Sequence, residues 1–371
     1  MKFIIAPFLT FIFFVCTLNK LFDFPLDKIF ILLACLVLLI LQKSISINAI
    51  KTLSIAVIVI LFTFYSNPFT FSLLLLFPLV GLLFTVLLIK KSEYGDYLYI
   101  GLWWHILIGF LLVIYSYVNP YTALDKYVHH MYDKGMPFLH AAMGFTPTVQ
   151  TFGTICMAWL LLYVNKKTLN SITNNDKFMF IVVIVSVFLT FNRNTFVLFL
   201  LFSFFYLRKL FYLFILTLFI SVVYYFNVIE SLILNMKTIN SRFNGLEGFQ
   251  NSFIKSDSWL VYLFGRGDNN VWDYRLTQNP LIENGIASML HSFGIIGFIT
   301  YGIIGSILIV LLIMNNKKVL AIFLFYVLFI QQIFTTEFYN GSFYIIVAVI
   351  LMSSNLFSNK NILQNENWNR C

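Results

Sequence analysis

Charged side chains are scarce in this chain. Only 11% of its 371 residues are Asp, Glu, Lys or Arg, whereas about 25% is usual for soluble domains. Hydrophobic residues make up 60% of the chain, and Phe alone occurs 44 times. A water-soluble domain of this length does not have such a composition. The composition therefore predicts a membrane protein.

The sequence also lacks the alternation of apolar and polar residues that is typical of membrane β-barrel strands. Its apolar runs are long and unbroken, and a helix needs roughly 20 such residues to cross a hydrocarbon core of about 30 Å. We therefore predict an all-α fold, a polytopic helical bundle of about 12 spans in one membrane domain, 1–371. The predicted spans are 3–18, 28–42, 51–66, 69–89, 97–118, 147–164, 178–191, 195–207, 210–228, 285–314, 319–335 and 341–357.

Cysteine is rare as well. Cys16, Cys35 and Cys156 fall inside predicted spans, and Cys371 belongs to the predicted inner tail. No disulfide is therefore expected between the outer loops. The apolar run after Lys2 has no small-residue cleavage site, which favours a first span over a signal peptide.

Three polar residues, Asn192, Arg193 and Asn194, interrupt the apolar stretch between Lys177 and Arg208. One helix over this stretch would be about 45 Å long, which exceeds the bilayer thickness. It would also hold the arginine near mid-bilayer, at a cost of at least about 2.5 kcal/mol. The sequence instead predicts a helical hairpin whose outer tip contains the three polar residues.

Basic residues support this topology. With both termini inside, every inner loop contains lysine or arginine, as the positive-inside rule requires. The basic residues on the predicted inner side are Lys2, Lys43, Lys51, Lys90, Lys91, Lys166, Lys167, Lys177, Arg208, Lys209, Lys317, Lys318, Lys360 and Arg370. The basic pI of 9.2 therefore reflects topology, and no nucleic-acid partner is predicted.

The first of two larger outer, periplasmic segments is 119–146. Apolar residues from Leu124 to Met131 recur at helical spacing, which predicts a short amphipathic helix on the membrane surface. His129 and His130 are adjacent, so their side chains would point about 100° apart on a helix. Because no third ligand has a motif spacing, we interpret them as solvated or interfacial histidines and predict no metal or other cofactor.

The second periplasmic segment, 229–284, combines arginines with aromatic residues. The arginine fork binds phosphate oxygens in pairs, and aromatic faces stack on sugar rings. Aromatic side chains beside a bilayer also act as plain anchors, and this alternative stays open for each of them. The "GRGDNN" tract, 265–270, is interpreted as a turn. The candidates for substrate binding are Arg266, Arg275, Trp259 and Trp272.

The segment that follows is predicted to form one long helix ending at Met314. Residues 279–280, Asn-Pro, are typical of a helix start. Roughly 20 residues counted back from Met314 put the outer membrane boundary near Gly294. Glu283 would stand above the bilayer and His291 at its edge, on the same helix face. A histidine that is hydrogen-bonded between helices is the alternative for His291.

Five features follow one another along the chain: "TFNRN" after a span, "SRF", "LFGRG", an acidic residue, and "LHSFGIIGFITYG". With the large outer loop late in the sequence, they resemble the O-antigen polymerases (Wzy type) and the related O-antigen ligases. The resemblance covers 189–357 and the overall topology, and it assigns Gly265 and Gly267 to a turn. It implies a glycosyltransferase of the bacterial inner membrane that moves glycan from undecaprenyl diphosphate at the periplasmic face, without a nucleotide sugar.

The same resemblance suggests catalytic residues. Arg193 and Arg242 match the family's arginines, and Glu283 and His291 are the candidates for the base. Where the ligases usually have a His-Asn pair before the last spans, this chain has Glu283 followed by Asn284. That difference favours a polymerase over a ligase.

The predicted function is therefore polymerisation of undecaprenyl-diphosphate-linked repeat units into O-antigen, a step of lipopolysaccharide biosynthesis. The expected partners are these lipid-linked units and membrane lipids, with a chain-length regulator and a flippase as further candidates. Two alternatives stay open. One is a ligase that transfers glycan to the lipid A core, and the other is a flippase or secondary transporter, for which mid-bilayer charges and repeat symmetry would be expected.

Overall fold

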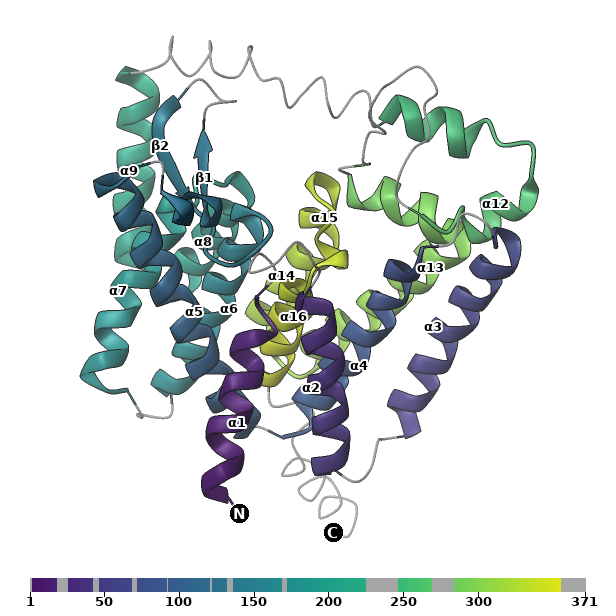
Figure 1. The fold of residues 1–371 in the computed structure, drawn as a ribbon, viewed down its shortest axis with the longest axis horizontal. Coiled ribbons are helices and arrows are strands. Elements are labelled where there is room, and N and C mark those ends of the chain that lie inside the picture. The colour runs from purple at the N-terminus through teal and green to yellow at the C-terminus, as the bar shows by residue number, and fades with distance from the viewer. Residues whose placement is uncertain are drawn as a thin grey trace.

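The computed structural model describes residues 2–18, 26–42, 47–68, 72–91, 93–120, 122–131, 136–168, 172–224, 246–268, 282 and 284–354. Within these ranges the chain is almost wholly helical, as predicted (Figure 1). The α-helices are α1 (Lys2–Val15), α2 (Leu26–Gln42), α3 (Ile47–Ser66), α4 (Phe77–Ile89), α5 (Glu93–Val118), α6 (Val149–Thr168), α7 (Asn174–Leu189), α8 (Arg193–Tyr206), α9 (Arg208–Tyr224), α12 (Trp259–Phe264), α13 (Gly285–Met314), α14 (Lys318–Phe325), α15 (Gln331–Phe334) and α16 (Gly341–Ser353).

Shorter elements connect these helices. The turns of 3₁₀-helix are η1 (Leu73–Leu76), η2 (Ala123–Tyr127) and η6 (Glu337–Tyr339), and the π-helical turns are η4 (Gln250–Ile254) and η5 (Tyr326–Ile330). Two antiparallel strands, β1 (Val128–Met131) and β2 (Met136–Ala142), form one hairpin.

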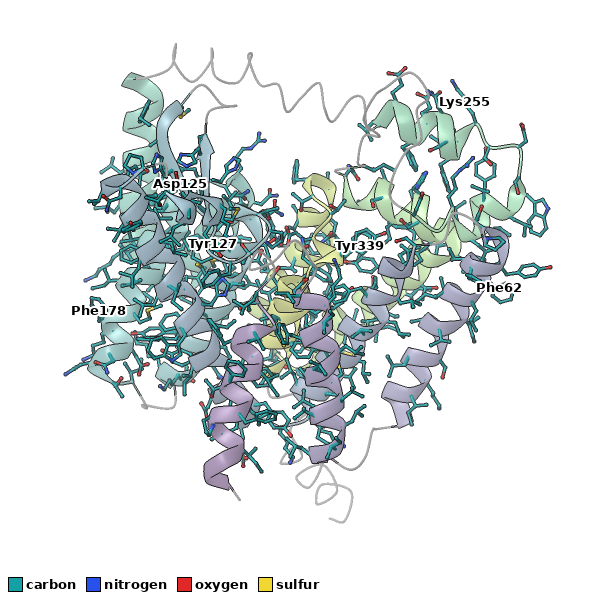
Figure 2. The ribbon with its side chains drawn as sticks, in the orientation of Figure 1. Phe62, Asp125, Tyr127, Phe178, Lys255 and Tyr339 are labelled. Atoms are coloured by element: carbon teal, nitrogen blue, oxygen red, sulfur yellow. The ribbon has the colours of Figure 1, made fainter. Side chains whose placement is uncertain are left out.

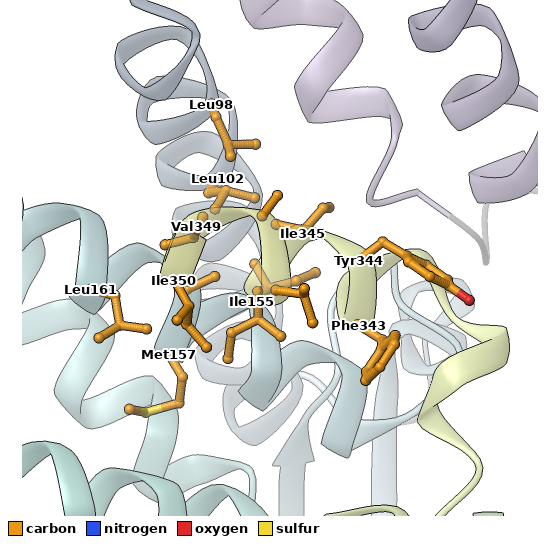
Figure 3. Close-up of a cluster of buried hydrophobic side chains, with 14 of the residues drawn as sticks. Leu98, Leu102, Ile155, Met157, Leu161, Phe343, Tyr344, Ile345, Val349 and Ile350 are labelled. Carbon is orange, nitrogen blue, oxygen red and sulfur yellow. The ribbon is translucent and has the colours of Figure 1, made fainter. Parts of the chain in front are cut away.

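The centre of the core is α16. Its residues from Gly341 to Met352 are all buried, and it packs against α2, α4, α6 and α14. In Figure 3 its side chains lie among those of α5 and α6, which include Leu102 and Ile155. A helix that is buried on every side is apolar all round. The hydrophobic pattern of α16 therefore marks no single inner face.

Successive helices run up and down between two ends of the molecule. The upper end, as drawn in Figure 1, carries β1, β2 and α12. At the lower end, Lys166 near the end of α6 forms an ion pair of 3.1 Å with Asp176 in the first turn of α7. At the upper end, Gln150 near the start of α6 donates a hydrogen bond of 2.7 Å to Thr335, which follows α15.

The polar interruption predicted at Asn192, Arg193 and Asn194 does separate two helices. α7 ends at Leu189, and α8 begins at Arg193, so the break comes slightly earlier than the predicted turn. The Asn192 side chain caps α8 by accepting hydrogen bonds from the backbone N–H groups of Asn194 at 3.0 Å and Thr195 at 3.1 Å. Such a cap satisfies donors that a helix start leaves free.

The amphipathic helix predicted in segment 119–146 is wrong. After the single turn η2, the chain forms the β1–β2 hairpin, in which Val128 pairs with Ala142 and His130 with His140. Val128 and Met131 are buried, as the helical spacing suggested. In a regular strand residues three apart point to opposite faces, and here a register shift between His130 and Met131 interrupts that alternation. The second strand, which decides between a helix and a hairpin, lies further along the chain.

Two helices within the described ranges are long and apolar enough to cross a membrane: α5 with 26 residues and α13 with 30. The other apolar helices in those ranges are shorter. Large apolar side chains also face outward. Phe62 of α3 and Phe178 of α7, on opposite flanks in Figure 2, are both exposed.

Candidate functional site

The end of α12 crosses the start of α13 with the two backbones in contact. Gly265 has a φ of 81° and Gly294 a φ of 67°, and the second value interrupts α13. A Cβ atom on Gly265 would overlap the carbonyl group of Ser292, and one on Gly294 would overlap that of Leu263. Only glycine fits both the positive φ and the close approach.

Backbone hydrogen bonds fasten this crossing. The N–H of Arg266 donates to the carbonyl oxygen of His291 at 2.6 Å, and the N–H of Gly267 donates to that of Ser292 at 3.1 Å. The Thr63 hydroxyl of α3 donates to the carbonyl oxygen of Phe264 at 2.8 Å. The "LFGRG" and "LHSFG" stretches, which are separate in the sequence, therefore form one unit in space.

His291 lies at the centre of this unit and is 1% exposed. Its Nδ1 lies 2.9 Å from the carbonyl oxygen of Asp268, and its Nε2 lies 3.0 Å from the Ser252 hydroxyl of η4. A carbonyl oxygen only accepts, so in the neutral ring these partners assign the proton to Nδ1, and Nε2 accepts from Ser252. Both ring nitrogens are thus engaged.

Asp268 supplies the carboxylate of the site. Its Oδ1 lies 3.6 Å from His291 Nδ1, and its side chain is 13% exposed. Burial raises the pKa of Asp268 to about 6, although the nearby Arg266 guanidinium opposes the rise. The pattern "GRGDNN" was interpreted only as a turn, so sequence reasoning missed Asp268. An acid directly after the paired glycines was the signal that was available.

Tyr339 of η6 joins the site through Ser292 of α13. Its hydroxyl donates to the Ser292 hydroxyl at 2.7 Å, which in turn donates to the carbonyl oxygen of Asp268 at 2.7 Å. Figure 2 shows Tyr339 near the middle of the molecule. Burial raises the pKa of the Tyr339 hydroxyl, so it stays protonated at neutral pH. We call Ser252, Arg266, Asp268, His291, Ser292 and Tyr339 the Asp268 cluster.

A second buried carboxyl group adjoins the cluster. Glu337 in η6 is 3% exposed, and its Oε2 accepts a hydrogen bond of 3.4 Å from the Ser342 hydroxyl. Burial raises the pKa of Glu337 to about 7. Sequence reasoning missed Glu337 and Tyr339, because nothing in the short polar stretch between the last two spans separates them from ordinary loop residues.

Two of the predicted substrate-binding residues can be placed. The Nε of Arg266 donates to the carbonyl oxygen of Ser252 at 2.7 Å, which holds the guanidinium in the Asp268 cluster. Trp259 begins α12, and its side chain is 67% exposed. That exposure suits both stacking on a sugar and anchoring at a membrane surface, so both predictions for Trp259 remain open.

Arg193 does not lie in the Asp268 cluster. It is the exposed first residue of α8, and in Figure 1 α8 and α12 lie on opposite sides of α14 to α16. The Tyr326 hydroxyl of η5 donates to the carbonyl oxygen of Asn194 at 3.3 Å, which ties the start of α8 to this central group. The structure therefore separates Arg193 from His291, although the sequence predicted the arginine at an outer hairpin tip and the histidine at the outer edge of the bilayer.

No protein-family model, no curated protein and no solved structure matches this chain.

The other predicted site residues, Arg242, Glu283, Arg275 and Trp272, lie outside the described residues and stay predictions. Residues 279–280, where the sequence predicts a helix start, also lie outside the described residues, and α13 as described begins at Gly285. The Asn284 side chain caps it by accepting a hydrogen bond of 2.9 Å from the N–H of Ala287. Among the residues that the structure describes, no group of three or more His, Cys, Asp or Glu could hold a metal ion.

Proposed function

We propose that this protein is a polytopic glycosyltransferase of the bacterial inner membrane that polymerises undecaprenyl-diphosphate-linked repeat units on the periplasmic face. The observation that carries the proposal is the Asp268 cluster. It joins two of the stretches on which the family resemblance rests, "LFGRG" and "LHSFG", and gathers an arginine, a carboxylate and an imidazole. These groups match the needs of glycosyl transfer from a lipid diphosphate.

The membrane location is supported by the outer face of α13. Ile295, Ile299, Ile303 and Ile307 recur every four residues and are all exposed, which forms an apolar stripe along the helix. Contiguous apolar surface of this kind is rare on soluble monomers. The part of α13 after Gly294 has roughly 20 residues, which is the length of one crossing. In this proposal the chain crosses the membrane about twelve times, with both termini inside.

Glycosyl transfer breaks the bond between the anomeric carbon of the donor glycan and the diphosphate oxygen, and the electron pair leaves with the diphosphate. The acceptor hydroxyl oxygen bonds to that carbon and gives up its proton. In our proposal the Asp268 carboxylate takes this proton, and the Arg266 guanidinium stabilises the charge that develops on the diphosphate.

Asp268 suits the base better than His291. The His291 ring is fully buried and both nitrogens are engaged, so it positions Asp268 and Ser252 and does not reach the acceptor. The Asp268 carboxylate reaches the surface, and its pKa of about 6 is near the working pH that a base needs. Glu283 remains the alternative base from the sequence.

Polymerisation needs two lipid diphosphates, one on the donor and one on the acceptor. Arg193 begins α8 and Arg266 follows α12, and these two helices lie on opposite sides of α14 to α16 in Figure 1. We therefore assign the donor diphosphate to Arg266 and the acceptor diphosphate to Arg193. The forked guanidinium of Arg193 binds two phosphate oxygens at once. Because Arg193 is at the start of α8, the positive end of the helix dipole also attracts the diphosphate.

The test is complementation of a gene deletion in the source bacterium. The deletion should leave single repeat units on the lipopolysaccharide, and the wild-type gene should restore the ladder of long chains. Arg193→Ala should fail to restore it at normal protein level, because loss of a charge-assisted contact of about 3 kcal/mol to the acceptor diphosphate weakens acceptor binding roughly a hundredfold. Arg193→Lys should restore it in part, since lysine keeps the charge without the fork.

Arg208→Ala is the matched control and should restore the full ladder, because Arg208 is the first residue of α9 and lies just beyond the opposite end of α8 from Arg193. A deletion that removes all repeat units from the lipopolysaccharide would contradict the polymerase and point to the ligase or flippase alternatives. A full ladder with Arg193→Ala would contradict the role of Arg193.

A further inference from the structure

An apolar cavity of about 130 Å³ lies between α3, α4, α13 and α16. Its walls include Ala56 and Val59 of α3, Leu82 of α4 and Leu308 of α13. Phe293 of α13 and Phe338 of η6 also line it, and in the sequence they are the neighbours of Ser292 and Tyr339. The hydroxyl groups of Ser292 and Tyr339 are hydrogen-bonded at 2.7 Å, so the cavity adjoins the Asp268 cluster at this pair, on the side of α13 away from His291.

The cavity offers nothing to a polar ligand. The hydroxyl groups on its walls are already used: Thr85 donates to the carbonyl oxygen of Gly81 at 2.9 Å, Thr300 to that of Ile296 at 2.8 Å, and Tyr301 to that of Leu328 at 2.7 Å. A buried water needs two to four polar partners, so water gains little here. A comparable apolar cavity of about 150 Å³ stays dry and accepts benzene. This one has room for about one branched five-carbon isoprene unit.

We propose that this cavity holds the first isoprene unit of the donor polyprenyl diphosphate, whose diphosphate lies at the Asp268 cluster. The inference rests on the proposed function for the identity of the lipid. The immediate change from polar cluster to apolar wall favours this lipid, because its apolar chain begins directly at the diphosphate. A phospholipid carries a polar glycerol diester between its phosphate and its acyl chains, and that spacer would fall inside the apolar walls.

Small residues keep the cavity open. Ala56 faces it from α3, and Gly305 faces it from α13, where an added Cβ would lie 3.1 Å from Leu328 Cδ1. A larger side chain at position 56 would occupy the space of the isoprene unit. Val57, the next residue on α3, is exposed and does not line the cavity, so it offers a matched control.

The test is photolabelling of the full-length protein in detergent with farnesyl diphosphate that carries a diazirine on its first isoprene unit. Labelled peptides should map to α3, α4 and α13, and undecaprenyl diphosphate should compete. Ala56→Phe should lower labelling at least about tenfold, because burial of one isoprene unit is worth more than that in affinity. Leu308→Trp fills the same space from α13 and should act alike, whereas Val57→Phe should label normally.

Labelling that maps elsewhere, or that survives both filling substitutions in folded protein, overturns the inference. Equal competition by phosphatidylglycerol also overturns it and makes the cavity a phospholipid site. The readout needs no turnover, so it separates the two proposals. If the cavity is labelled but deletion of the gene leaves the chain ladder intact, the proposed function alone is contradicted. If the protein polymerises repeat units but is labelled elsewhere, this inference alone is contradicted.

Discussion

Asp268 combines burial, an arginine neighbour and a path to the surface in one side chain. Burial disfavours its charged form, and the Arg266 guanidinium favours it, so the pKa settles at about 6. The carboxylate is therefore mostly ionised at neutral pH and able to accept a proton. His291 contributes by holding the backbone of Asp268 in place through Nδ1.

This balance predicts how the rate depends on pH. Only the ionised carboxylate acts as a base, so the rate should rise with pH up to about 6 and level off above it. Asp268→Asn should lower the rate about a hundredfold or more and remove this rise, since general-base catalysis contributes at least that much. The measurement is polymerisation of defined undecaprenyl-diphosphate repeat units per mole of folded protein.

Asp257→Asn is the control for the Asp268→Asn variant. Asp257 is an exposed acid elsewhere in the same segment, and its loss should change neither the rate nor the pH profile. A normal rate for Asp268→Asn would eliminate Asp268 as the base and return Glu283 to first place.

The crossing of α12 and α13 is the element on which the site depends. It brings Arg266 and Asp268 to His291 through backbone contact, and it needs glycine at two positions. The positive φ of Gly294 falls at the outer boundary counted from the sequence, so α13 changes direction where the predicted membrane surface lies. A longer side chain there would separate the two segments.

Two glycines of α13 provide a matched test of this element. Gly294→Ala should lower the free energy of unfolding by about 2 kcal/mol or more, because the added Cβ meets backbone atoms and the φ is positive. Gly302→Ala should raise it by up to about 1 kcal/mol, because Gly302 is helical and has nothing within 4 Å of an added Cβ. Chemical denaturation in detergent micelles measures both. Equal stability of the two variants would show that the crossing is not needed for folding.

The whole molecule is arranged around α16, with helices that alternate in direction on both sides of it (Figure 1). Chain segments that the charge pattern assigns to one membrane side meet at one end of the molecule. Lys166 and Asp176 do so at the lower end. At the upper end, Tyr117 near the end of α5 meets His140 of β2, and Gln150 of α6 meets Thr335, which follows α15. The proposed orientation therefore makes the upper end periplasmic.

Cysteine labelling tests this orientation in cells that express a variant of the protein without its native cysteines. Lys126→Cys and Asp257→Cys, both exposed at the upper end, should react with a membrane-impermeant thiol reagent from outside. Lys167→Cys and Lys317→Cys, exposed at the lower end, should react only after the membrane is permeabilised. Labelling at position 317 in intact cells, without labelling at 257, would refute the proposed topology.

The amino-acid sequence by itself determined the helical fold, the break near Arg193 and the end of the last long helix at Met314, because local apolar runs and polar interruptions decide these features. It also marked Arg266 and His291 as candidates. It did not reveal the β1–β2 hairpin, where Val128 finds its partner only at Ala142.

Only the tertiary structure decided which candidates meet. Arg266, Asp268 and His291 come together because two glycines allow backbone contact between segments that are distant in sequence, and Arg193 stays apart because α14 to α16 lie between. Asp268 became a candidate base through its burial, which is a property of the folded neighbourhood and not of the tract "GRGDNN". The spacing of residues in the sequence shows which of them share one face of a helix. A site between helices depends on long-range contacts that no local pattern encodes.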